Sequence, residues 1–411
     1  MAIAKSPLTE SQAERRLPVG WRWVRFGDVV RSTKVNVDAA TAGLERYVAG
    51  EHMSTDDLHI RSWGKVGNGY LGPAFHRRFA KGQVLYGSRR TYLRKVAVAN
   101  FDGICANTTL VLEPSSDDLL ASLLPFVMQT ESFHAHSIRE SKGSVNPYVN
   151  WSDLAWYQFA LPPCRVQKRI AKLLWTADEQ LQKWTNAFAC GVEVRASLVR
   201  HFLSSADANT WQQRPCESVL SNGPQNGYSP SVNVAGRGAP TLTLSAIRDG
   251  KVRAPGNLKF AEISDQDLDK FRLREKDLLV VRGNGNRSLV GACGIVDEVP
   301  ENCFFPDLMI RLIVDEEQIR PEFLCLQWNQ AEVHQRLLAG AKSSNGIWKV
   351  NGQDVRKHTL LVPPIAEQDA LIELANRASN AIDQLSHRVR QSARLRAAAL
   401  ESLLVERRLS V

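Results

Sequence analysis

The 411-residue chain contains an internal repeat that spans about half of its length. The stretch LPPCRVQKRIAKLL contains Pro162 and Gln167, and the stretch VPPIAEQDALIEL contains Pro363 and Gln368 at equivalent positions, 201 residues further on. A period this long exceeds the 20–50 residues of solenoid repeats. The chain is therefore expected to contain two copies of one supersecondary plan, each large enough to be a domain.

Each copy begins with a mixed segment of short β-branched runs separated by Gly and Asn turns, and continues through a Pro-Pro pair into a long helical stretch. Proline is disfavoured inside a helix and favoured just before one, so each Pro-Pro pair marks a boundary. The predicted parts are a flexible N-terminus at 1–16, a first globular domain at 17–162, a central helix at 163–206, a second globular domain at 207–363 and a distal helix at 364–408.

Both helical stretches carry an apolar stripe with alternating steps of four and three residues. This spacing is typical of a coiled coil, and the shared register favours packing of the two helices on each other, antiparallel. The alternative is that each helix only covers the core of its own domain. Two stripe positions break the pattern in both copies: Gly191 with Ser392, and Arg195 with Arg396. The predicted fold is α+β (α/β), with two pseudo-twofold-related globular domains separated by two long antiparallel coiled-coil helices.

The charge balance, Lys+Arg 52 against Asp+Glu 43, gives a net charge of +9, which allows a polyanionic partner without requiring one. None of the seven cysteines forms a CxxC pair, so we expect no metal site and no cofactor. The N-terminus has no apolar signal region, and no run is apolar enough to cross a bilayer. We expect a cytoplasmic protein without membrane contact.

Two similar domains held at a fixed separation suit a bipartite linear target such as duplex DNA. Four stretches then carry a family resemblance: LPVGWRWVRFGDVV (17–30), KGQVLYGSRRTYLRKVAVA (81–99) and the two Pro-Pro helix starts. They resemble the specificity subunits of type I restriction-modification enzymes, in the family's order of recognition domain, helix, recognition domain, helix. The chain departs from the pattern at Arg165 and Val166, which precede Gln167, and in the second domain, which lacks the LPxGW opening.

The resemblance implies a subunit that recognises DNA and catalyses nothing itself. Each recognition domain would read one half of a bipartite double-stranded DNA site, and the helices would set the spacing and hold two methyltransferase (modification) subunits. Two ATP-dependent restriction subunits would then join this core. Arg195 and Arg396 are best explained by pairing or snorkelling at the edge of the stripe, and the alternative makes them candidate partner-binding residues for the methyltransferase subunits.

In the first copy, the stretch SRRTYLRK interleaves basic residues with an aromatic one directly after a predicted strand. Such residues suit phosphate contacts and guanine reading. A solvated charged turn is the alternative. The candidate DNA-binding residues here are Arg89, Arg90, Tyr92, Arg94 and Lys95.

The equivalent place in the second copy reads RGNGNRS, where glycines let the backbone approach a ligand and Asn and Arg match base edges. A Gly/Asn hairpin without a partner is the alternative. The candidate residues are Arg282, Asn284, Asn286 and Arg287. Two further polar loops place Lys142 and Lys342 beside an aromatic residue, where they are either phosphate contacts or parts of plain connections.

The main competing hypothesis is a stand-alone DNA-modifying enzyme, a methyltransferase or nuclease with duplicated DNA-binding domains. Asn146-Pro147-Tyr148 is similar to the NPPY motif of adenine methyltransferases, but it lacks the second proline, and no glycine-rich cofactor loop follows a strand. No acidic cluster suits a nuclease metal, and the nine histidines are scattered. We therefore predict no catalytic residues. A purely structural protein would explain the helices but leave the basic loops without a role.

Overall fold

The computed structural model of the chain describes residues 17–69, 71–205, 211–233, 235–344 and 346–406. These residues form two compact units: unit 1 comprises the described residues up to 185 and from 387 onward, and unit 2 comprises those between 186 and 386. Two helices of 40 residues each, α6 (Cys164–Leu203) and α11 (Ile365–Leu404), contribute one part to each unit. The predicted mixed fold with two long helices is confirmed. The predicted domain limits stay predictions, and the N-terminal stretch 1–16 lies outside the described residues.

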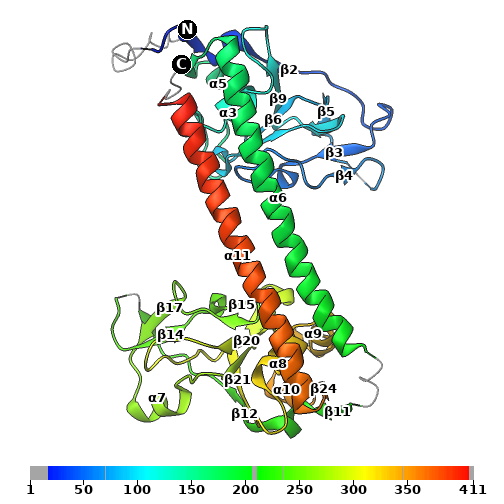
Figure 1. Cartoon of the computed structure of the whole chain (residues 1–411), viewed down its shortest axis with the longest axis vertical. Coiled ribbons are helices and arrows are strands. Elements are labelled where there is room, and N and C mark those ends of the chain that lie inside the picture. The colour runs from blue at the N-terminus through cyan, green and yellow to red at the C-terminus, as the bar shows by residue number, and fades with distance from the viewer. Residues whose placement is uncertain (1–16, 70, 206–210, 234, 345, 407–411) are drawn as a thin grey trace. The chain divides into compact units, whose positions relative to one another are not determined.

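Unit 1 contains a mixed α/β segment built on two four-stranded sheets and one strand pair (Figure 1). The first sheet has the order β2-β9-β6-β7 and is antiparallel throughout, and the second has the order β4-β3-β8-β5. The strands are β1 (Arg22–Arg25), β2 (Val30–Thr33), β3 (Arg46–Val48), β4 (Gly64–Lys65), β5 (Phe75–Phe79), β6 (Val84–Gly87), β7 (Val96–Val98), β8 (Gly103–Ala106), β9 (Thr109–Pro114) and β10 (Gln158–Leu161). The helices are α2 (Phe26–Val29), α3 (Leu124–Val127), α4 (Glu131–Arg139) and α5 (Trp151–Leu154), with 3-10 turns η1 (Gly50–His52) and η2 (Thr91–Leu93).

Unit 2 repeats this plan with a six-stranded sheet in the order β12-β21-β18-β20-β16-β15, two three-stranded sheets and one strand pair. The strands are β11 (Gln212–Pro215), β12 (Leu220–Asn226), β13 (Val232–Asn233), β14 (Ala239–Leu242), β15 (Ile247–Arg248), β16 (Lys251–Val252), β17 (Leu258–Ala261), β18 (Leu278–Val281), β19 (Gly283–Asn284), β20 (Cys293–Val296), β21 (Met309–Val314), β22 (Lys342–Ser344), β23 (Ile347–Lys349) and β24 (Thr359–Val362). The helices are α7 (Asp265–Phe271), α8 (Pro321–Trp328), α9 (Ala331–Ala339) and α10 (Gly352–Arg356), with 3-10 turns η4 (Cys216–Val219), η5 (Leu244–Ala246) and η6 (Arg287–Leu289).

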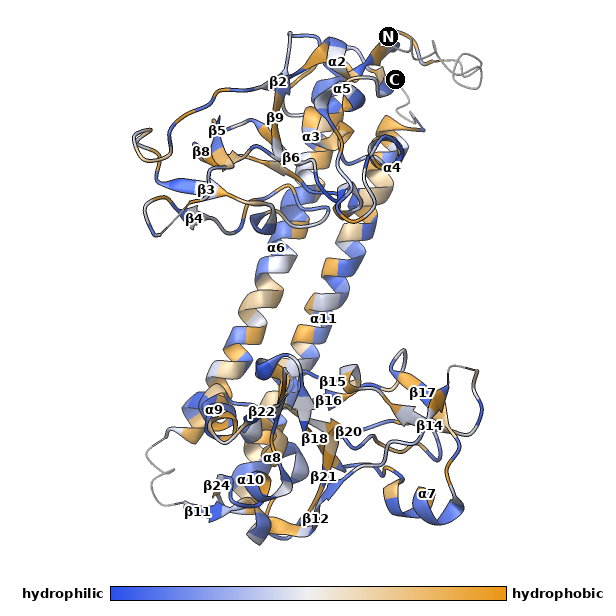
Figure 2. Cartoon of the chain, turned by 180° about the vertical axis from the view of Figure 1, so that it is seen from behind, coloured by the Kyte–Doolittle hydropathy of each residue, from blue (hydrophilic) through white to orange (hydrophobic). Residues whose placement is uncertain are grey.

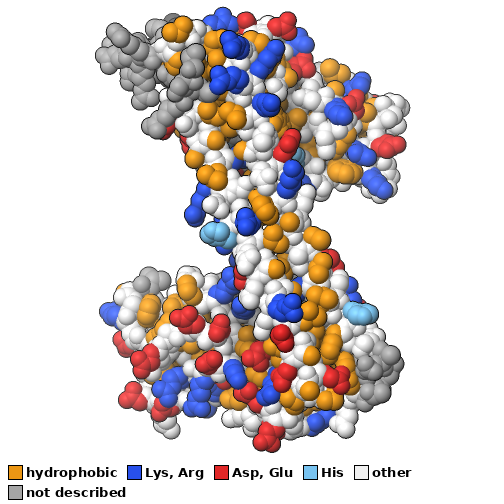
Figure 3. Space-filling view, viewed as in Figure 1, with side chains coloured by type: hydrophobic (Ala, Val, Ile, Leu, Met, Phe, Trp, Pro, Cys, Tyr) orange, Lys and Arg blue, Asp and Glu red, His pale blue; other side chains and the backbone are white. Residues whose placement is uncertain are grey.

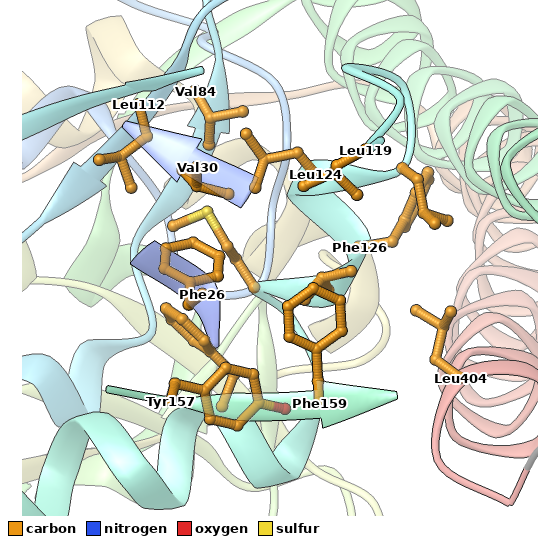
Figure 4. Close-up of a cluster of buried hydrophobic side chains, with 14 of the residues drawn as sticks. Phe26, Val30, Val84, Leu112, Leu119, Leu124, Phe126, Tyr157, Phe159 and Leu404 are labelled. Atoms are coloured by element: carbon orange, nitrogen blue, oxygen red, sulfur yellow. The ribbon is translucent and has the colours of Figure 1, made fainter. Parts of the chain in front are cut away.

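Both long helices contribute side chains to the hydrophobic core of each unit. In unit 1, Ile170 of α6 and Leu400 and Leu404 of α11 join a cluster centred on Phe26 and its aromatic neighbours; Figure 4 shows Leu404 bordering this cluster. In unit 2, Val199 of α6 and Leu371 of α11 are buried with the β18 and β21 side chains. Burying a Leu, Ile or Val side chain contributes about 1.5–3 kcal/mol, so these contacts hold the helices to their mixed segments.

The two helices run antiparallel within unit 1. Arg396 of α11 pairs with Asp178 of α6, whereas Arg388 of α11 lies over the ring of Trp184, at 4.9 Å from its centroid. Residue numbers therefore rise along α6 as they fall along α11. Apolar and polar residues alternate along both helices, as an amphipathic seam requires (Figure 2).

The same antiparallel arrangement is present within unit 2. Arg195 of α6 donates a hydrogen bond from Nη1 to Ser379 Oγ of α11, at 3.4 Å. Gly191 packs closely on α11: a Cβ there would lie 3.3 Å from Ile382 and 3.5 Å from Leu385. This close approach accounts for the glycine that interrupts the apolar stripe of α6.

A buried glutamine fixes the start of α6 to the mixed segment of unit 1. The Gln167 Oε1 atom accepts from the backbone N–H of Leu120 at 2.9 Å. Its Nε2 atom donates to the carbonyls of Asp118, at 2.7 Å, and Pro162, at 2.9 Å. The side-chain amide is thus fully used between the helix and the loop before α3.

The matched Gln368 makes the same three bonds at the start of α11 in unit 2. Its Oε1 accepts from the N–H of Arg320 at 2.8 Å, and its Nε2 donates to the carbonyls of Gln318, at 3.0 Å, and Pro363, at 2.8 Å. Both glutamines are almost fully buried. The residue that marks the repeat in the sequence is therefore a clamp between helix and mixed segment in both copies.

Replacing either clamp with alanine should lower the free energy of unfolding by about 2–4 kcal/mol, because a buried N–H and two buried carbonyls lose their partner. Hydrogen exchange should then localise the damage: Gln167→Ala should expose the amides around residues 118–123, and Gln368→Ala those around 318–323. Gln180→Ala, at an exposed position of α6, is the control. Equal exchange in both loops of both variants would contradict separate clamps.

Candidate nucleic-acid interface

In unit 1, the predicted basic stretch forms a tight turn directly after β6. Arg90 and Arg94 flank the 3-10 turn η2, and both have left-handed backbone conformations, with φ of 49° and 51°. Such values are uncommon for residues other than glycine. The turn leaves Arg89, Arg90 and Tyr92 exposed to solvent. We call residues 89–95 the basic turn of unit 1.

A second predicted loop, residues 141–148, packs against this basic turn. The Arg90 N–H donates to the carbonyl of Pro147 at 2.5 Å, and Arg89 forms an isolated β-bridge with Tyr148. Lys142 and Tyr148 exchange two backbone hydrogen bonds, of 2.8 and 2.9 Å, that close the loop. The Arg89 guanidinium lies 5.8 Å from the centroid of the Tyr148 ring. We call residues 141–148 the aromatic loop of unit 1.

In unit 2, the segments equivalent to the basic turn and the aromatic loop of unit 1 pair with each other as β-strands. β19, which carries Asn284, pairs with β23, and β23 pairs with β22, which carries Lys342. The Arg287 guanidinium lies 4.8 Å from the Trp348 ring and also donates to the carbonyl of Leu338 at 3.4 Å. Residues 282–288 are the basic turn of unit 2, and residues 341–349 are its aromatic loop. Each unit therefore places an arginine of its basic turn against an aromatic ring of its aromatic loop.

The side-chain carbonyls of the two predicted asparagines are used inside the basic turn of unit 2. Asn284 Oδ1 accepts from the N–H of Asn286 at 2.9 Å. Asn286 Oδ1 in turn accepts from the N–H of Ser288 at 3.0 Å and caps η6. These bonds shape the turn and leave the side-chain amide groups as the part available to a ligand.

The predicted cations fall into two groups. Within the described residues, Arg89, Arg90, Arg287 and Lys342 have no carboxylate at ion-pair distance, and all four are exposed. The other four side chains have internal partners: Arg94 bonds to Asp56 and Glu131, Lys95 to the Gly50 carbonyl, Lys142 to Asp153 and Arg282 to Asp307. Burial, together with Arg90 nearby, lowers the pKa of Lys95. DNA contact by these four residues stays a prediction. Their internal bonds give each of them a structural role as the alternative.

The two candidate partner-binding arginines are engaged in the helix seam. Arg396 is 11% exposed and pairs with Asp178, while Arg195 is half-buried and donates to Ser379. These contacts support the alternative that the arginines are paired within the chain. Their docking of another subunit stays a prediction.

Several contacts of charged and aromatic residues were not predicted from the sequence. Arg46 stacks on Trp63 and Phe101 at 4.6 and 5.0 Å, although the three are far apart in the chain. Asp178 pairs with Arg396, but no sequence pattern distinguishes it from the other polar residues of the helix. Tyr148 and Trp348, 200 residues apart, could have been singled out through the repeat.

Acidic side chains gather on one part of unit 2. Figure 3 shows them on the face where α7 lies, and this helix carries Asp265, Asp267 and Asp269. Phosphates are repelled from such a surface. Within the described residues, the basic turn and aromatic loop of unit 2 offer Arg287 and Lys342, which have no carboxylate at ion-pair distance.

The part of the chain that the structure describes contains neither a metal-binding cluster nor a membrane-spanning helix. No group of three or more His, Cys, Asp or Glu residues there could hold a metal ion. Burial raises the pKa of the Cys105, Cys216 and Cys303 thiols to about 12. No described helix combines the length and apolarity needed to span a bilayer.

The family model described as the type I restriction modification DNA specificity domain matches residues 18–187. The type I restriction enzyme EcoKI specificity subunit of Escherichia coli (strain K12) is 29% identical over 157 residues, which are 38% of this chain and 33% of that protein. Residues 18–187 of the chain are therefore similar to the DNA specificity domain of type I restriction-modification systems. The aligned region spans only about a third of that relative.

Two solved structures match the fold of nearly the whole chain. A chain from a structure on complex assembly and conformational transition of the type I restriction-modification system matches with a TM-score of 0.57 at 16% identity, covering 94% of this chain and 98% of that chain. The S subunit from M. genitalium matches with a TM-score of 0.53 at 12% identity, covering 95% and 98%. Both mixed segments and both helices of this chain therefore fall within the matched fold.

One buried histidine in each unit lacks a hydrogen-bond partner for at least one ring nitrogen: His134 beneath the basic turn of unit 1, and His358 beside Trp328 in unit 2. Burial, reinforced by Arg94, lowers the pKa of His134 to about 4, although Glu131 opposes the shift. Burial, reinforced by Arg336 and His334, lowers the pKa of His358 to about 4. Both rings are therefore neutral in the folded chain near neutral pH.

The free energy of unfolding should fall as the pH drops from about 6.5 to 4. In this window the unfolded histidines bind protons and the folded ones do not, so each contributes a slope of at most about 1.4 kcal/mol per pH unit. Urea titrations at several pH values measure this slope. His134→Leu and His358→Leu should each flatten it, and His201→Leu, at an exposed position, should not. An unchanged slope in the double variant would refute this assignment.

Proposed function

We propose that the chain is the DNA-sequence-specificity subunit of a type I restriction-modification enzyme and that each unit reads one half of a bipartite site. The observation that carries this proposal is the repeated arrangement of an arginine and an aromatic ring. Arg89 lies against Tyr148 in unit 1, and Arg287 against Trp348 in unit 2. The similarity of residues 18–187 to a DNA specificity domain supports DNA as the class of target.

The chemistry of this arrangement suits the reading of bases. A guanidinium presents a rigid fork of donors that matches O6 and N7 of guanine in the major groove. Stacking on an aromatic ring restricts the arginine side chain before DNA arrives, so less conformational entropy is lost on binding. Arg90 and Lys342, exposed and without a carboxylate partner among the described residues, suit phosphates, which position the protein on the duplex.

We propose that the chain itself is non-catalytic and acts in the cytoplasm with two methyltransferase subunits and two ATP-dependent restriction subunits. Exposed apolar residues on the long helices support docking of partners. Four apolar residues on the helices each lie one position before a stripe position (174, 195, 375 or 396), and all four are exposed: Leu173, Val194, Leu374 and Leu395. Exposed apolar side chains that recur at one position of a coiled coil mark an interaction surface.

The opposite flank of the helices is used by the chain itself. Three residues each lie one position after a stripe position (170, 198 or 399): Ala171, Val199 and Leu400. All three are buried against the mixed segment of their own unit. Of the five large apolar residues that are exposed on the described parts of the two helices, the open flank therefore carries four, and Val192 lies on the other flank. This division leaves room for another subunit on the paired helices while the mixed segments bind DNA.

Arg89→Ala should weaken binding about 5- to 150-fold and relax recognition of one half-site only, because a bidentate base contact is worth about 1–3 kcal/mol. Arg287→Ala, the matched variant in unit 2, should affect the other half-site. Methylome sequencing of the host identifies the bipartite motif, and competition binding to single-base variants of it measures the effect. Loss at both half-sites from either variant would contradict one reader per unit.

Arg90→Ala should instead weaken binding to all sequences alike and reduce the slope of log K against log salt by about 1, as the loss of one phosphate contact does. The slope is obtained from binding isotherms at several salt concentrations. Arg139→Ala, which removes an exposed arginine paired with Glu140, is the control of equal charge change. A salt response that is flat in the wild type would argue against DNA binding altogether.

Removing one heptad from α6 and the facing heptad from α11 should shorten the preferred spacer between half-sites by about three base pairs. Seven residues of helix correspond to about 10 Å, and the rise of DNA is about 3.4 Å per base pair. A library of sites with different spacers reports the preference. Retention of the original spacer would show that the helices do not set the distance.

A further inference from the structure

A buried ion pair joins the two long helices within unit 1. The Asp178 carboxylate of α6 is 2% exposed and accepts from Arg396 Nη1 of α11 at 3.0 Å. Its second oxygen lies 2.6 Å from Nε2 of His59, in the mixed segment. Both carboxylate oxygens are thus engaged, one by a helix and one by the loop that precedes β4.

Arg396 extends this contact to the basic turn through a single residue. Its Nη2 atom donates to the carbonyl of Asp56 at 2.9 Å. The Asp56 carboxylate lies 2.9 Å from Nε of Arg94, and the Asp56 N–H donates to the Arg94 carbonyl at 3.3 Å. Asp56 therefore connects α11 to the C-terminal end of the basic turn. Its φ of 54° is unusual for a residue other than glycine, so its neighbours must hold it there.

The basic turn needs such support because its own backbone is strained. Arg90 and Arg94 are left-handed at its two ends, and each costs on the order of 1 kcal/mol or more relative to the ordinary regions. Thr55 adds a second bond from the same loop, from its Oγ1 to the carbonyl of Leu93 at 2.9 Å. The conformation that exposes Arg89, Arg90 and Tyr92 is thus held from the loop around Asp56.

Unit 2 has the same helix register, but a serine takes the place of the carboxylate opposite the arginine. Arg195 and Ser379 stand 201 residues from Arg396 and Asp178, respectively, and form a neutral–cation hydrogen bond of 3.4 Å. The copy at unit 2 shows that a serine opposite the arginine is compatible with packing of these helices. The carboxylate in unit 1 is therefore not a requirement of the seam.

Stability alone also gives little reason for this ion pair. Two charges taken out of water lose hydration energy that their attraction often fails to repay, and buried pairs can be replaced without loss. The Asp178–Arg396 pair has a second consequence, however: it fixes the direction of the Arg396 guanidinium toward the Asp56 carbonyl. The buried Gln129 amide oxygen, which also accepts from Arg396 at 3.0 Å, has the same effect.

We propose that Asp178 and Arg396 are positioning residues that hold the basic turn of unit 1 in its DNA-reading conformation. Discrimination at the half-site read by unit 1 then depends on a contact within the helix seam, whereas discrimination by unit 2 does not. The inference rests on the proposed function, because it assumes that the basic turn reads DNA.

The test variant is Asp178→Ser in the full chain, purified with its methyltransferase subunits. It gives unit 1 the Arg–Ser pair that unit 2 already has, so folding should be retained, and melting curves check this. Competition binding then uses duplexes with single-base changes in either half of the motif. Discrimination at the unit 1 half-site should fall about two- to tenfold, in line with the usual effect of altering such a contact network. Discrimination at the other half-site and the salt slope should not change.

Arg396→Lys is the second variant and decides the matter if Asp178→Ser proves unstable. A lysine keeps a cation beside Asp178 but cannot also reach the Asp56 carbonyl with a fixed fork, so the same half-site should lose discrimination. Ser379→Asp in unit 2 is the matched control and should leave both half-sites unchanged. Folded variants with wild-type discrimination, or with equal loss at both half-sites, would overturn the proposal. A wild-type complex without any bipartite motif would instead defeat the proposed function itself.

Discussion

The packing of two distant helix segments into each core is the constraint on which the rest of the structure depends. The core of unit 1 contains Leu174 from α6 and Leu400 from α11, and the core of unit 2 contains Val199 from α6 and Leu371 from α11. Neither mixed segment completes its core from its own copy of the repeat. Each buried leucine contributes about 2 kcal/mol, so formation of the antiparallel seam and folding of each unit are coupled. A shift in helix register would damage both cores at once.

The contacts that the two copies share and those in which they differ have different roles. Both copies pair the strand that opens the mixed segment with the strand before the long helix, β1 with β10 and β11 with β24. Both also use a buried glutamine, Gln167 or Gln368, with the same three backbone partners. The copies differ in the basic turns and in the seam residue opposite the arginine. The shared contacts define the scaffold, and the differences lie where the target is read.

The sequence was sufficient to predict the scaffold but not the geometry of the candidate interface. The helix pair could be predicted because proline marks its boundaries and apolar spacing is a local property of the chain. The stacking of Arg89 on Tyr148 joins residues 59 positions apart and arises from a β-bridge that only the tertiary fold creates. The exceptions in the stripe have the same origin. Gly191 reflects the proximity of Ile382, and Arg396 reflects a carboxylate that no local pattern reveals.

The candidate cations fall into two groups, those against an aromatic ring and those without one. This difference separates sequence specificity from general affinity for DNA. Arg89 and Arg287 lie against aromatic rings, which restricts their guanidinium groups and suits directional contacts with base edges. Arg90 and Lys342 are exposed and have no ring partner among the described residues, which suits contacts with phosphates that depend on salt and not on sequence. Arg94 and Lys95 hold the turn itself. A substitution at the stacked arginine can therefore change which base is preferred while the neighbouring cations keep the duplex bound, and the scaffold beneath remains unaltered.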